Sequence, residues 1–289
     1  MKNLLILFFL LANLSVFGQD STQNVKPLLF EVKMKDGSVL FGNIISQDAY
    51  TMDLQTENMG KVTLSKNQVE NIRQIEKQEG IRGEQLYFRT SNRTRYFFAP
   101  SAYSLDKGEL YYQNTYLFLN FFNYGITKNF SFGAGFEAIS TLAGRPIIML
   151  APKVSGALSE KWHLSGGILY INSLKNDFDG LGIAYGTTTY GTEDHNLSAG
   201  LGYGFVRDSW SKQPVYTFSG MTRLSPRFGL VTENWIIPFN GSYEGLLSLG
   251  FRIFGDRFSF DFALVRPAIS DWNNDFIAVP YIDILIKIK

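Results

Sequence analysis

The chain has 289 residues, which is room for one large domain or for a small domain followed by a large one. Its formal net charge of +1 argues against nucleic acid as a partner, because phosphate binding needs an excess of Lys and Arg. Cysteine is absent, which excludes disulfides, cysteine-based metal sites and thiol nucleophiles.

The first residues follow the pattern of a secretory signal. A basic start with Lys2 precedes an unbroken apolar run over residues 4–11, and small and polar residues continue to Gly18. This pattern predicts a signal peptide over residues 1–18 that is cleaved on export. No later stretch approaches 18 uninterrupted apolar residues, so a membrane crossing by this chain is expected to use the strands of a closed barrel.

Residues 28–76 are expected to form a small all-β module. The tight-turn pair Asp36-Gly37 joins the first two of five short segments with strand-like alternation. These segments are residues 30–35, 39–45, 50–56, 61–64 and 70–75. Five short strands in so small a stretch suit a strongly bent, five-stranded β-barrel.

One segment of this module carries a family resemblance. Val32-Lys-Met-Lys-Asp-Gly-Ser-Val-Leu-Phe-Gly42, followed by the strand end Thr63-Leu64-Ser65, resembles the Sm-like and SH3-like small barrels. The Sm family binds RNA, but an exported chain does not routinely meet RNA, and the module has no basic surface interleaved with aromatic residues. We therefore expect a periplasmic module that contacts a periplasmic protein or serves in packing.

Residues 77–93 are charged and polar and are expected to be a linker to a large barrel over residues 94–289. Residues 96–103 are predicted either as a first barrel strand or as an apolar lead-in. The later strands are predicted at residues 109–118, 120–127, 129–139, 146–157, 162–173, 181–191, 196–206, 214–224, 227–237, 245–254, 257–266 and 277–288. If the first two are one long strand, residues 94–104 take the vacant place, so the total is about twelve, with ten as the alternative.

The predicted strands alternate apolar or aromatic residues with small and polar ones. Within residues 130–136, three phenylalanines and Ala134 occupy the even positions, and Ser131, Gly133 and Gly135 occupy the odd ones. A strand needs these two faces when lipid lies outside the barrel and a wet lumen inside. Aromatic residues make up 15% of the chain, as girdles at both membrane interfaces would require. The alternative is an aromatic-rich soluble β-sandwich.

The connections between the predicted strands alternate in length. The short set is residue 128 and residues 159–161, 192–195, 225–226 and 255–256, and the longer set is residues 140–145, 174–180, 207–214, 238–244 and 267–276. Outer-membrane barrels have short periplasmic turns and longer outer loops. The sequence therefore predicts an all-β chain whose antiparallel transmembrane β-barrel lies in outer-membrane lipid, with the small module on the periplasmic side.

Several strand segments resemble the outer-membrane β-barrel proteins of the Bacteroidetes type. The resemblance rests on Tyr111-Tyr-Gln-Asn-Thr-Tyr116, Asn123-Tyr-Gly-Ile-Thr127, Leu201-Gly-Tyr-Gly-Phe205 and Leu230-Val-Thr-Glu-Asn-Trp235, and it spans most of residues 90–289. It implies the outer membrane as the location and a barrel as the fold, and it brings no known substrate.

Charged residues of both signs fall in the phase expected to face the lumen. The candidates are Glu137, Lys153, Arg223, Glu233, Arg252, Asp261, Asp283 and Lys287. Ionisable residues at membrane depth are costly unless they face water or one another. They are therefore expected either to line a polar pore or to pair across a narrow lumen and hold the barrel closed.

These features favour a non-enzymatic protein, either a narrow passive channel for small polar solutes or a structural membrane protein. No cofactor, metal site or catalytic residue is expected. One alternative is a lipid-modifying barrel enzyme, because His163 and Ser165 lie two apart on one strand face, as in the outer-membrane lipid A deacylases. A further alternative is a secreted soluble β-protein that binds carbohydrate through its aromatic residues.

Overall fold

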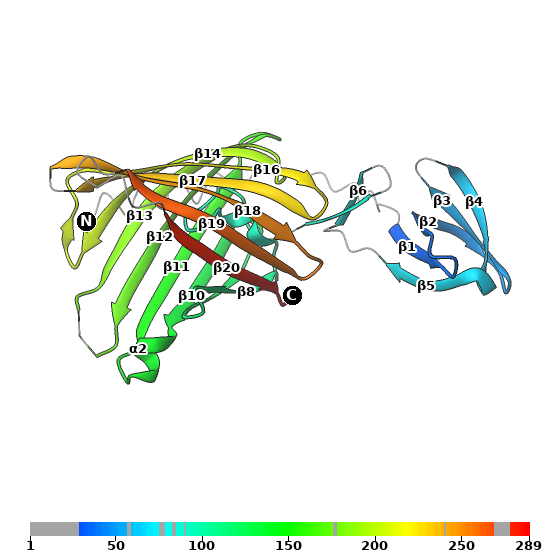
Figure 1. Ribbon diagram of the computed structural model, residues 1–289, viewed down its shortest axis with the longest axis horizontal. Helices are drawn as coiled ribbons and strands as arrows, with labels where there is room; N and C mark the ends of the chain where they lie inside the picture. The colour runs from blue at the N-terminus through cyan, green and yellow to red at the C-terminus, as the bar shows by residue number, and fades with distance from the viewer. Residues whose placement is uncertain are drawn as a thin grey trace. The chain divides into compact units, whose positions relative to one another are not determined.

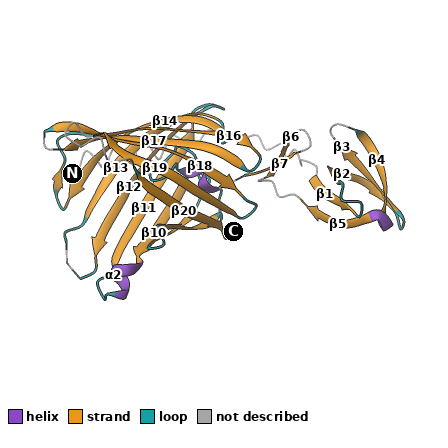
Figure 2. Cartoon of the chain, viewed as in Figure 1, coloured by secondary structure: helices purple, strands orange, loops and turns teal. Residues whose placement is uncertain are grey.

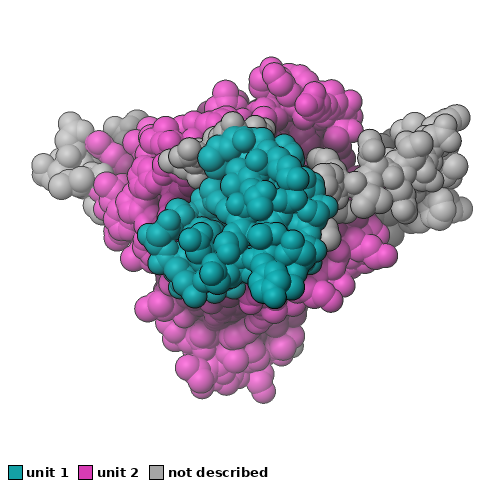
Figure 3. Space-filling view, turned by 90° about the vertical axis from the view of Figure 1, so that its right-hand side faces the viewer, with its two compact units in different colours: residues 1–76 teal, residues 77–289 magenta. Residues whose placement is uncertain are grey.

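The computed structural model describes residues 29–56, 59–74, 79–82, 85–89, 91–175, 178–239, 241–268 and 278–289. The predicted signal peptide lies outside these residues. The chain divides into two compact units, residues 1–76 and residues 77–289, which Figure 3 distinguishes by colour.

Unit 1 is a five-stranded antiparallel sheet. Its strands are β1 (Leu29–Met34), β2 (Val39–Gln47), β3 (Thr51–Thr56), β4 (Gly60–Ser65) and β5 (Val69–Gln74), with the 3-10 turn η2 (Lys66–Gln68) before β5. The strand order is β4-β3-β2-β1-β5, so β4 and β5 are the edge strands. Val32, Met52 and Leu54 are fully buried in its core, because alternate residues of each strand point to the same face. The five predicted strands are confirmed.

Unit 2 begins with a two-stranded hairpin and continues into a ring of long strands (Figure 1). The hairpin is β6 (Glu79–Arg82) with β7 (Gln85–Phe88), and the 3-10 turn η3 (Ser91–Thr94) follows it. The ring consists of β8 (Leu110–Thr115), β9 (Leu119–Gly125), β10 (Phe130–Glu137), β11 (Ile147–Ala157), β12 (Trp162–Ser173), β13 (Leu181–Gly191), β14 (His195–Val206), β16 (Val215–Ser225), β17 (Phe228–Phe239), β18 (Ser242–Phe254), β19 (Phe258–Ala268) and β20 (Val279–Lys287). The two-residue strand β15 (Ser209–Trp210) extends the end of β14, and the short helix α2 (Ala138–Leu142) follows β10.

The ring is a closed antiparallel barrel of twelve strands, as predicted. Each strand pairs with its neighbour in the chain, and β20 pairs with β8 from Asp283↔Thr115 to Lys287↔Tyr111. Closure leaves no edge strand, so every strand of the wall has a hydrogen-bonding neighbour on both sides. The alternative of two stacked sheets is excluded by this topology.

The outer surface of the barrel is apolar. On β14, Leu197 is 68% exposed on the outside, while its neighbours Asn196 and Ser198 are buried on the inside. The same phase exposes Leu249 and Phe218 on the strands that follow. A belt of this kind is far larger than the apolar patches of soluble monomers, and hydrocarbon is the solvent that suits it. The chain is therefore an outer-membrane β-barrel protein. Among the residues described, no helix has the length and hydropathy to cross a bilayer.

The two ends of the barrel differ in their connections. We call one end the short-turn end, formed by residues 126–129, 158–161, 192–194, 226–227 and 255–257. We call the other the long-loop end, where residues 138–146, 174–180 and 207–214 connect the strands. The prediction of a long loop at residues 238–244 is wrong, because β17 continues to Phe239 and β18 already begins at Ser242. Gly241 supplies the left-handed backbone there, with φ of +86°.

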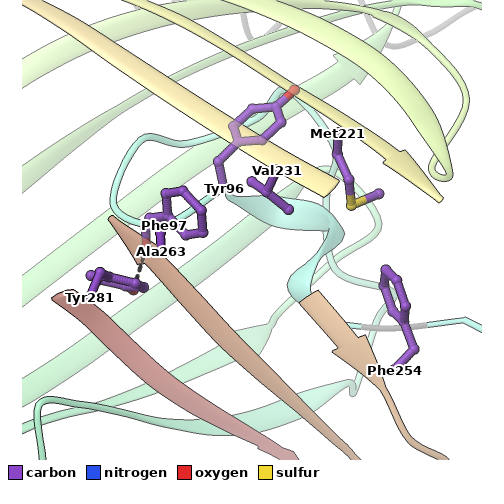
Figure 4. Packing of buried hydrophobic residues seen from close by; sticks show 7 residues of the cluster. All are labelled: Tyr96, Phe97, Met221, Val231, Phe254, Ala263 and Tyr281. Atoms are coloured by element: carbon purple, nitrogen blue, oxygen red, sulfur yellow. Dashed lines mark hydrogen bonds between the residues drawn. The ribbon is translucent and has the colours of Figure 1, made fainter. Parts of the chain in front are cut away.

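Residues 91–106 form a plug inside the barrel, so the alternative in which residues 94–104 supply a wall strand is wrong. Tyr96 and Phe97 are buried among inward-facing side chains of five wall strands, β16 to β20 (Figure 4). Those side chains are Met221, Val231, Phe254, Ala263 and Tyr281. The plug lies within the ring of wall strands, so it lacks the lipid-facing side that a wall strand needs. Figure 2 shows η3 as a helical turn within the ring of strands, and the wall begins only at Leu110.

The lipid-facing assignment predicts the effect of a charge on the outer wall. Leu249 lies near the middle of β18 and is 65% exposed. Leu249→Arg is expected to lower the unfolding free energy of the barrel in lipid by about 2–4 kcal/mol, because a guanidinium at the bilayer midplane loses its hydration. Ile45→Arg, at an exposed position of unit 1, is the matched control and is expected to leave barrel stability unchanged. Equal stability of the wild type and both variants in a denaturant titration in vesicles would contradict the assignment.

Candidate functional site

The plug enters the lumen from the short-turn end and returns to it. Arg89, just before the plug, binds Glu193 of the β13–β14 turn at 2.5 and 2.7 Å and Asp106 at 2.6 Å. The arginine side chain of Arg93 then pairs with Glu109 at 2.5 and 3.0 Å, with both side chains about 1% exposed. These contacts fix the start and the end of the plug at one end of the barrel.

A tight turn forms the tip of the plug, and Glu233 of β17 holds it. The Oε2 atom of Glu233 accepts hydrogen bonds from the backbone N–H groups of Phe97, Phe98 and Ala99 at 2.8, 2.9 and 2.8 Å. Its Oε1 atom accepts from Nε1 of Trp235 at 2.7 Å. Three successive amides that converge on one oxygen make an anion-binding nest. Here the nest belongs to the plug and the anion belongs to the wall.

A buried ion pair on the wall holds the plug on a second side. Arg252 of β18 binds Asp261 of β19 through two hydrogen bonds of 2.7 and 2.8 Å. Its remaining donors reach the carbonyl oxygens of Asn92 at 3.2 Å and Tyr96 at 2.7 Å. Because a buried arginine needs all its donors satisfied, the ion pair is complete only with the plug in place.

Asp283 of β20 holds the plug where the barrel closes. It accepts from Nη2 of Arg95 at 2.5 Å, from Nε2 of Gln113 at 3.0 Å and from Oγ1 of Thr115 at 2.6 Å. Gln113 and Thr115 lie on β8, so one carboxylate joins the last wall strand, the first wall strand and the plug. This arrangement couples closure of the barrel to the position of the plug.

Lys153 of β11 holds the plug from the wall opposite β18. Its Nζ atom donates to the carbonyl oxygens of Thr94, Ser101 and Tyr103 at 3.0, 2.7 and 2.8 Å. All three ammonium donors are therefore used on the backbone of the plug. Together with Glu233, Arg252 and Asp283, this lysine anchors the plug from different sides of the lumen.

Three of the predicted lumen residues, Glu137, Lys287 and Arg223, lie near the rims of the barrel. Glu137 ends β10 and caps α2, accepting from the N–H groups of Ile139 and Ser140 at 2.7 and 2.6 Å. Lys287 is half-buried at the short-turn end of β20. Neither contributes to the anchoring of the plug described above.

Arg223 closes the short-turn end beneath the plug. It binds Asp194 at 2.9 Å and lies over the ring of Phe254, with 4.1 Å from its Cζ atom to the ring centroid. It therefore lies against Phe254, one of the buried side chains around Tyr96 and Phe97.

His163 and Ser165 both point inward and both meet the plug. The ring of His163 packs on Tyr103 with centroids 4.6 Å apart, and Ser165 donates to the carbonyl oxygen of Ser101 at 3.3 Å. Nδ1 of His163 has no hydrogen-bond partner within the described chain. The histidine and serine are thus engaged separately by the plug, which is the arrangement of a packing pair and lacks the hydrogen bond of a nucleophile with its base.

The sequence interpretation missed the plug arginines. Arg89 and Arg93 were assigned to the linker over residues 77–93, and Arg95 to the start of the barrel over residues 94–289. The three arginines pair with Glu193, Glu109 and Asp283, and this pairing is visible only once the wall is closed.

A cavity of about 210 Å³ lies inside the barrel beside the plug tip. Its wall combines side chains of the plug with inward-facing side chains from strands on several sides of the ring. The apolar members include Phe98, Leu119, Phe121, Met149, Leu169, Ile183, Val215 and Trp235. Among the described residues, no group of three or more His, Asp or Glu side chains is placed to hold a metal ion.

Comparison with known proteins adds only distant likenesses. No family model and no curated protein matches this sequence. The solved structures that resemble it include a KdgM porin, with 6% identity and a TM-score of 0.46 over 62% of this chain and 98% of that one. Another is OmpTdeltaL8, a loop deletion mutant of the outer membrane protein OmpT of Vibrio cholerae, with 12% identity and a TM-score of 0.33 over 90% of this chain and 96% of that one. At these scores the likenesses carry no argument, and the assignment rests on the closed barrel and its apolar exterior.

The nest at Glu233 makes a prediction about the plug backbone. In the wild type, the amide protons of Phe97, Phe98 and Ala99 are expected to exchange slowly with solvent, because each donates to a buried carboxylate. Glu233→Ala leaves these donors without an acceptor, at about 1–3 kcal/mol for each unsatisfied group, and is expected to accelerate their exchange by at least tenfold.

Glu137→Ala is the matched control for that experiment. Glu137, like Glu233, lies in the inward-facing phase of its strand, but its carboxylate caps α2. Amide exchange followed by mass spectrometry on peptides that contain residues 97–99 reports the difference. Rapid exchange of these amides in the wild type would show that the nest does not persist in solution.

Proposed function

We propose that this protein is a channel-type outer-membrane barrel that residues 91–106 hold shut. The observation that carries this proposal is the grip of Glu233 on three successive backbone amides of the plug tip. In an open pore this carboxylate would be hydrated by water, whereas here three plug amides and Nε1 of Trp235 supply its donors in place of water.

The same geometry supports one of the two interpretations of the charged lumen. Lys153, Glu233 and Asp283 bind the plug directly, and Asp261 holds Arg252, which also binds it. The hydrogen-bonding groups of these side chains are occupied by the plug. This favours the interpretation in which the charges hold the barrel closed over the one in which they line a polar pore.

The strength of the contacts argues against frequent spontaneous opening. Hydrogen bonds to charged groups are worth about 1.5–3 kcal/mol each when net exchange with water is included. Expulsion of the plug breaks several of them together and also exposes Tyr96 and Phe97, which are 2% and 1% exposed. We therefore propose that small polar solutes pass only after the plug has been released, and that the resting protein is a non-enzymatic, closed barrel.

For unit 1 we propose a periplasmic contact module. Its edge strands β4 and β5 offer unpaired backbone groups to an added strand, and Tyr50 is an apolar side chain that is 81% exposed. The resemblance of residues 32–42 to Sm-like and SH3-like barrels supports a small β-fold made for contact, with a periplasmic protein as the partner.

Single-channel recording in planar bilayers tests the closed state. The wild type is expected to be silent, and the double variant Glu233→Ala/Lys153→Ala is expected to show intermittent openings, because it loses two anchors from opposite walls. Glu137→Ala should remain silent. Heat-modifiable mobility in gels confirms that each barrel is folded.

A steady open conductance of the folded wild type would refute closure by the plug. Silence of the folded double variant would refute the channel and would leave a structural membrane protein.

A further inference from the structure

The inner wall of the barrel changes character along its axis. The half that anchors the plug presents charged and hydroxyl side chains to the lumen. Toward the long-loop end the same phase of the strands presents apolar side chains. On β11, inward-facing Lys153 and Ser155 are followed toward the long-loop end by inward-facing Ala151, Met149 and Ile147. A lumen that only conducts water and polar solutes needs no such surface, because barrel interiors of that kind are polar.

The cavity beside the plug tip is bounded by this apolar surface. Its volume of about 210 Å³ exceeds that of an engineered apolar cavity of about 150 Å³ that binds benzene. Phe121, Met149, Leu169, Ile183 and Val215 enclose it from five strands. The space therefore fits one aromatic ring with a short chain, or a short acyl chain.

The plug offers a further apolar contact to the same space. Phe98 lies at the plug tip and lines the cavity, yet its side chain is 52% exposed, while its neighbours Phe97 and Ala99 are each 1% exposed. Its ring meets Tyr281 edge-on, with centroids 5.0 Å apart. An aromatic side chain inside the barrel is thus left uncovered toward the cavity, where a ligand would cover it.

One cation in the cavity wall has a donor to spare. Arg95 lines the cavity and is more than nine-tenths buried, with Nη2 on Asp283 and Nη1 on the carbonyl oxygen of Phe97. Its Nε atom has no partner within the described chain. A buried guanidinium donor without an acceptor costs free energy, and an acceptor on a ligand would remove that cost.

The charge balance of the cavity also favours an anion. Lys153 lines the cavity as well, and its Nζ atom contacts only carbonyl oxygens, with no carboxylate within ion-pair distance among the described residues. Of the charged side chains that line the cavity, Arg95 is paired with Asp283 and Lys153 has no such carboxylate partner in the part of the chain that the structure describes, so the cavity wall carries one positive charge in excess. A single negative charge on a ligand completes the balance, and a carboxylate matches the planar donors of arginine.

We propose that this cavity binds a small amphiphilic monocarboxylate. The apolar body lies among Phe98, Phe121, Met149 and Ile183, and the carboxylate accepts from Arg95. The site depends on the plug in its described position and is independent of whether the plug ever leaves the lumen, so silence or conductance of the barrel does not bear on it.

Calorimetric titration with 4-phenylbutyrate tests the proposal, with the protein-free detergent as the blank. The wild type is expected to bind saturably and at least tenfold more tightly than it binds 4-phenylbutan-1-ol, which has the same body without the charge. Ala151→Phe places a ring inside the cavity and is expected to abolish binding. Ala199→Phe, on the outer face of β14, is the matched control and is expected to bind as the wild type does.

Arg95→Lys keeps the positive charge but removes the planar set of guanidinium donors, so it tests which of the two the carboxylate needs. It keeps the pairing with Asp283 possible and is expected to weaken binding of the carboxylate while leaving binding of the alcohol unchanged. Saturable binding that is equal in the wild type and in folded Ala151→Phe would overturn the cavity as the site. Equal affinity of the wild type for acid and alcohol would overturn the carboxylate as the recognised group, and absence of saturable binding of either would overturn the proposal as a whole.

Discussion

A carboxylate buried inside a membrane-spanning barrel needs hydrogen-bond donors that replace the water it has lost. Glu233 meets this requirement with four N–H groups, and three of them come from the plug tip. The rest of the lumen follows the same rule, since Arg252 and Lys153 also complete their hydrogen bonds on the plug backbone. Wall and plug are therefore one polar network, in which neither part is satisfied without the other.

This network divides the lumen into two halves with different chemistry. In the half toward the short-turn end, charge and hydrogen bonding hold a segment of the chain in place. In the half toward the long-loop end, apolar side chains enclose a cavity that no part of the described chain fills. The plug tip is the boundary between them, because Ala99 faces the network and Phe98 faces the cavity. The plug therefore bounds the cavity on the side of the short-turn end.

The wall strands were predictable from sequence because in all of them apolar residues alternate with small or polar ones, with a period of two. Most predicted strand ends lie within two or three residues of the observed ones, since lipid on one side and protein or water on the other force alternation at every position. The connection between β17 and β18 was predicted too long, because the turn-forming residues around Gly241 indicated a loop over residues 238–244. In the structure β17 continues to Phe239 and β18 begins at Ser242. Local turn signals mark a turn but do not measure the length of its loop.

The plug and the cavity were not predictable, for two physical reasons. Residues 95–103 are buried except at Phe98 and Pro100, so no period of two separates a lipid-facing side from a lumen-facing side. Arg95 and Pro100 also give the segment the composition of an irregular linker. The cavity depends on segments such as residues 147–151, which are apolar on both faces and hide the fact that Met149 points inward. Only the closed ring shows which apolar side chains meet lipid and which meet the lumen.

The central claim is that residues 91–106 lie inside the barrel with the tip turned toward the long-loop end. Because the chain has no cysteine, single-cysteine variants report it directly through a membrane-impermeant maleimide applied to whole cells. Phe98→Cys is expected to react and Ala99→Cys, one residue further on, to stay unlabelled, since the two side chains are 52% and 1% exposed. Equal labelling of both positions would contradict a plug seated in the lumen.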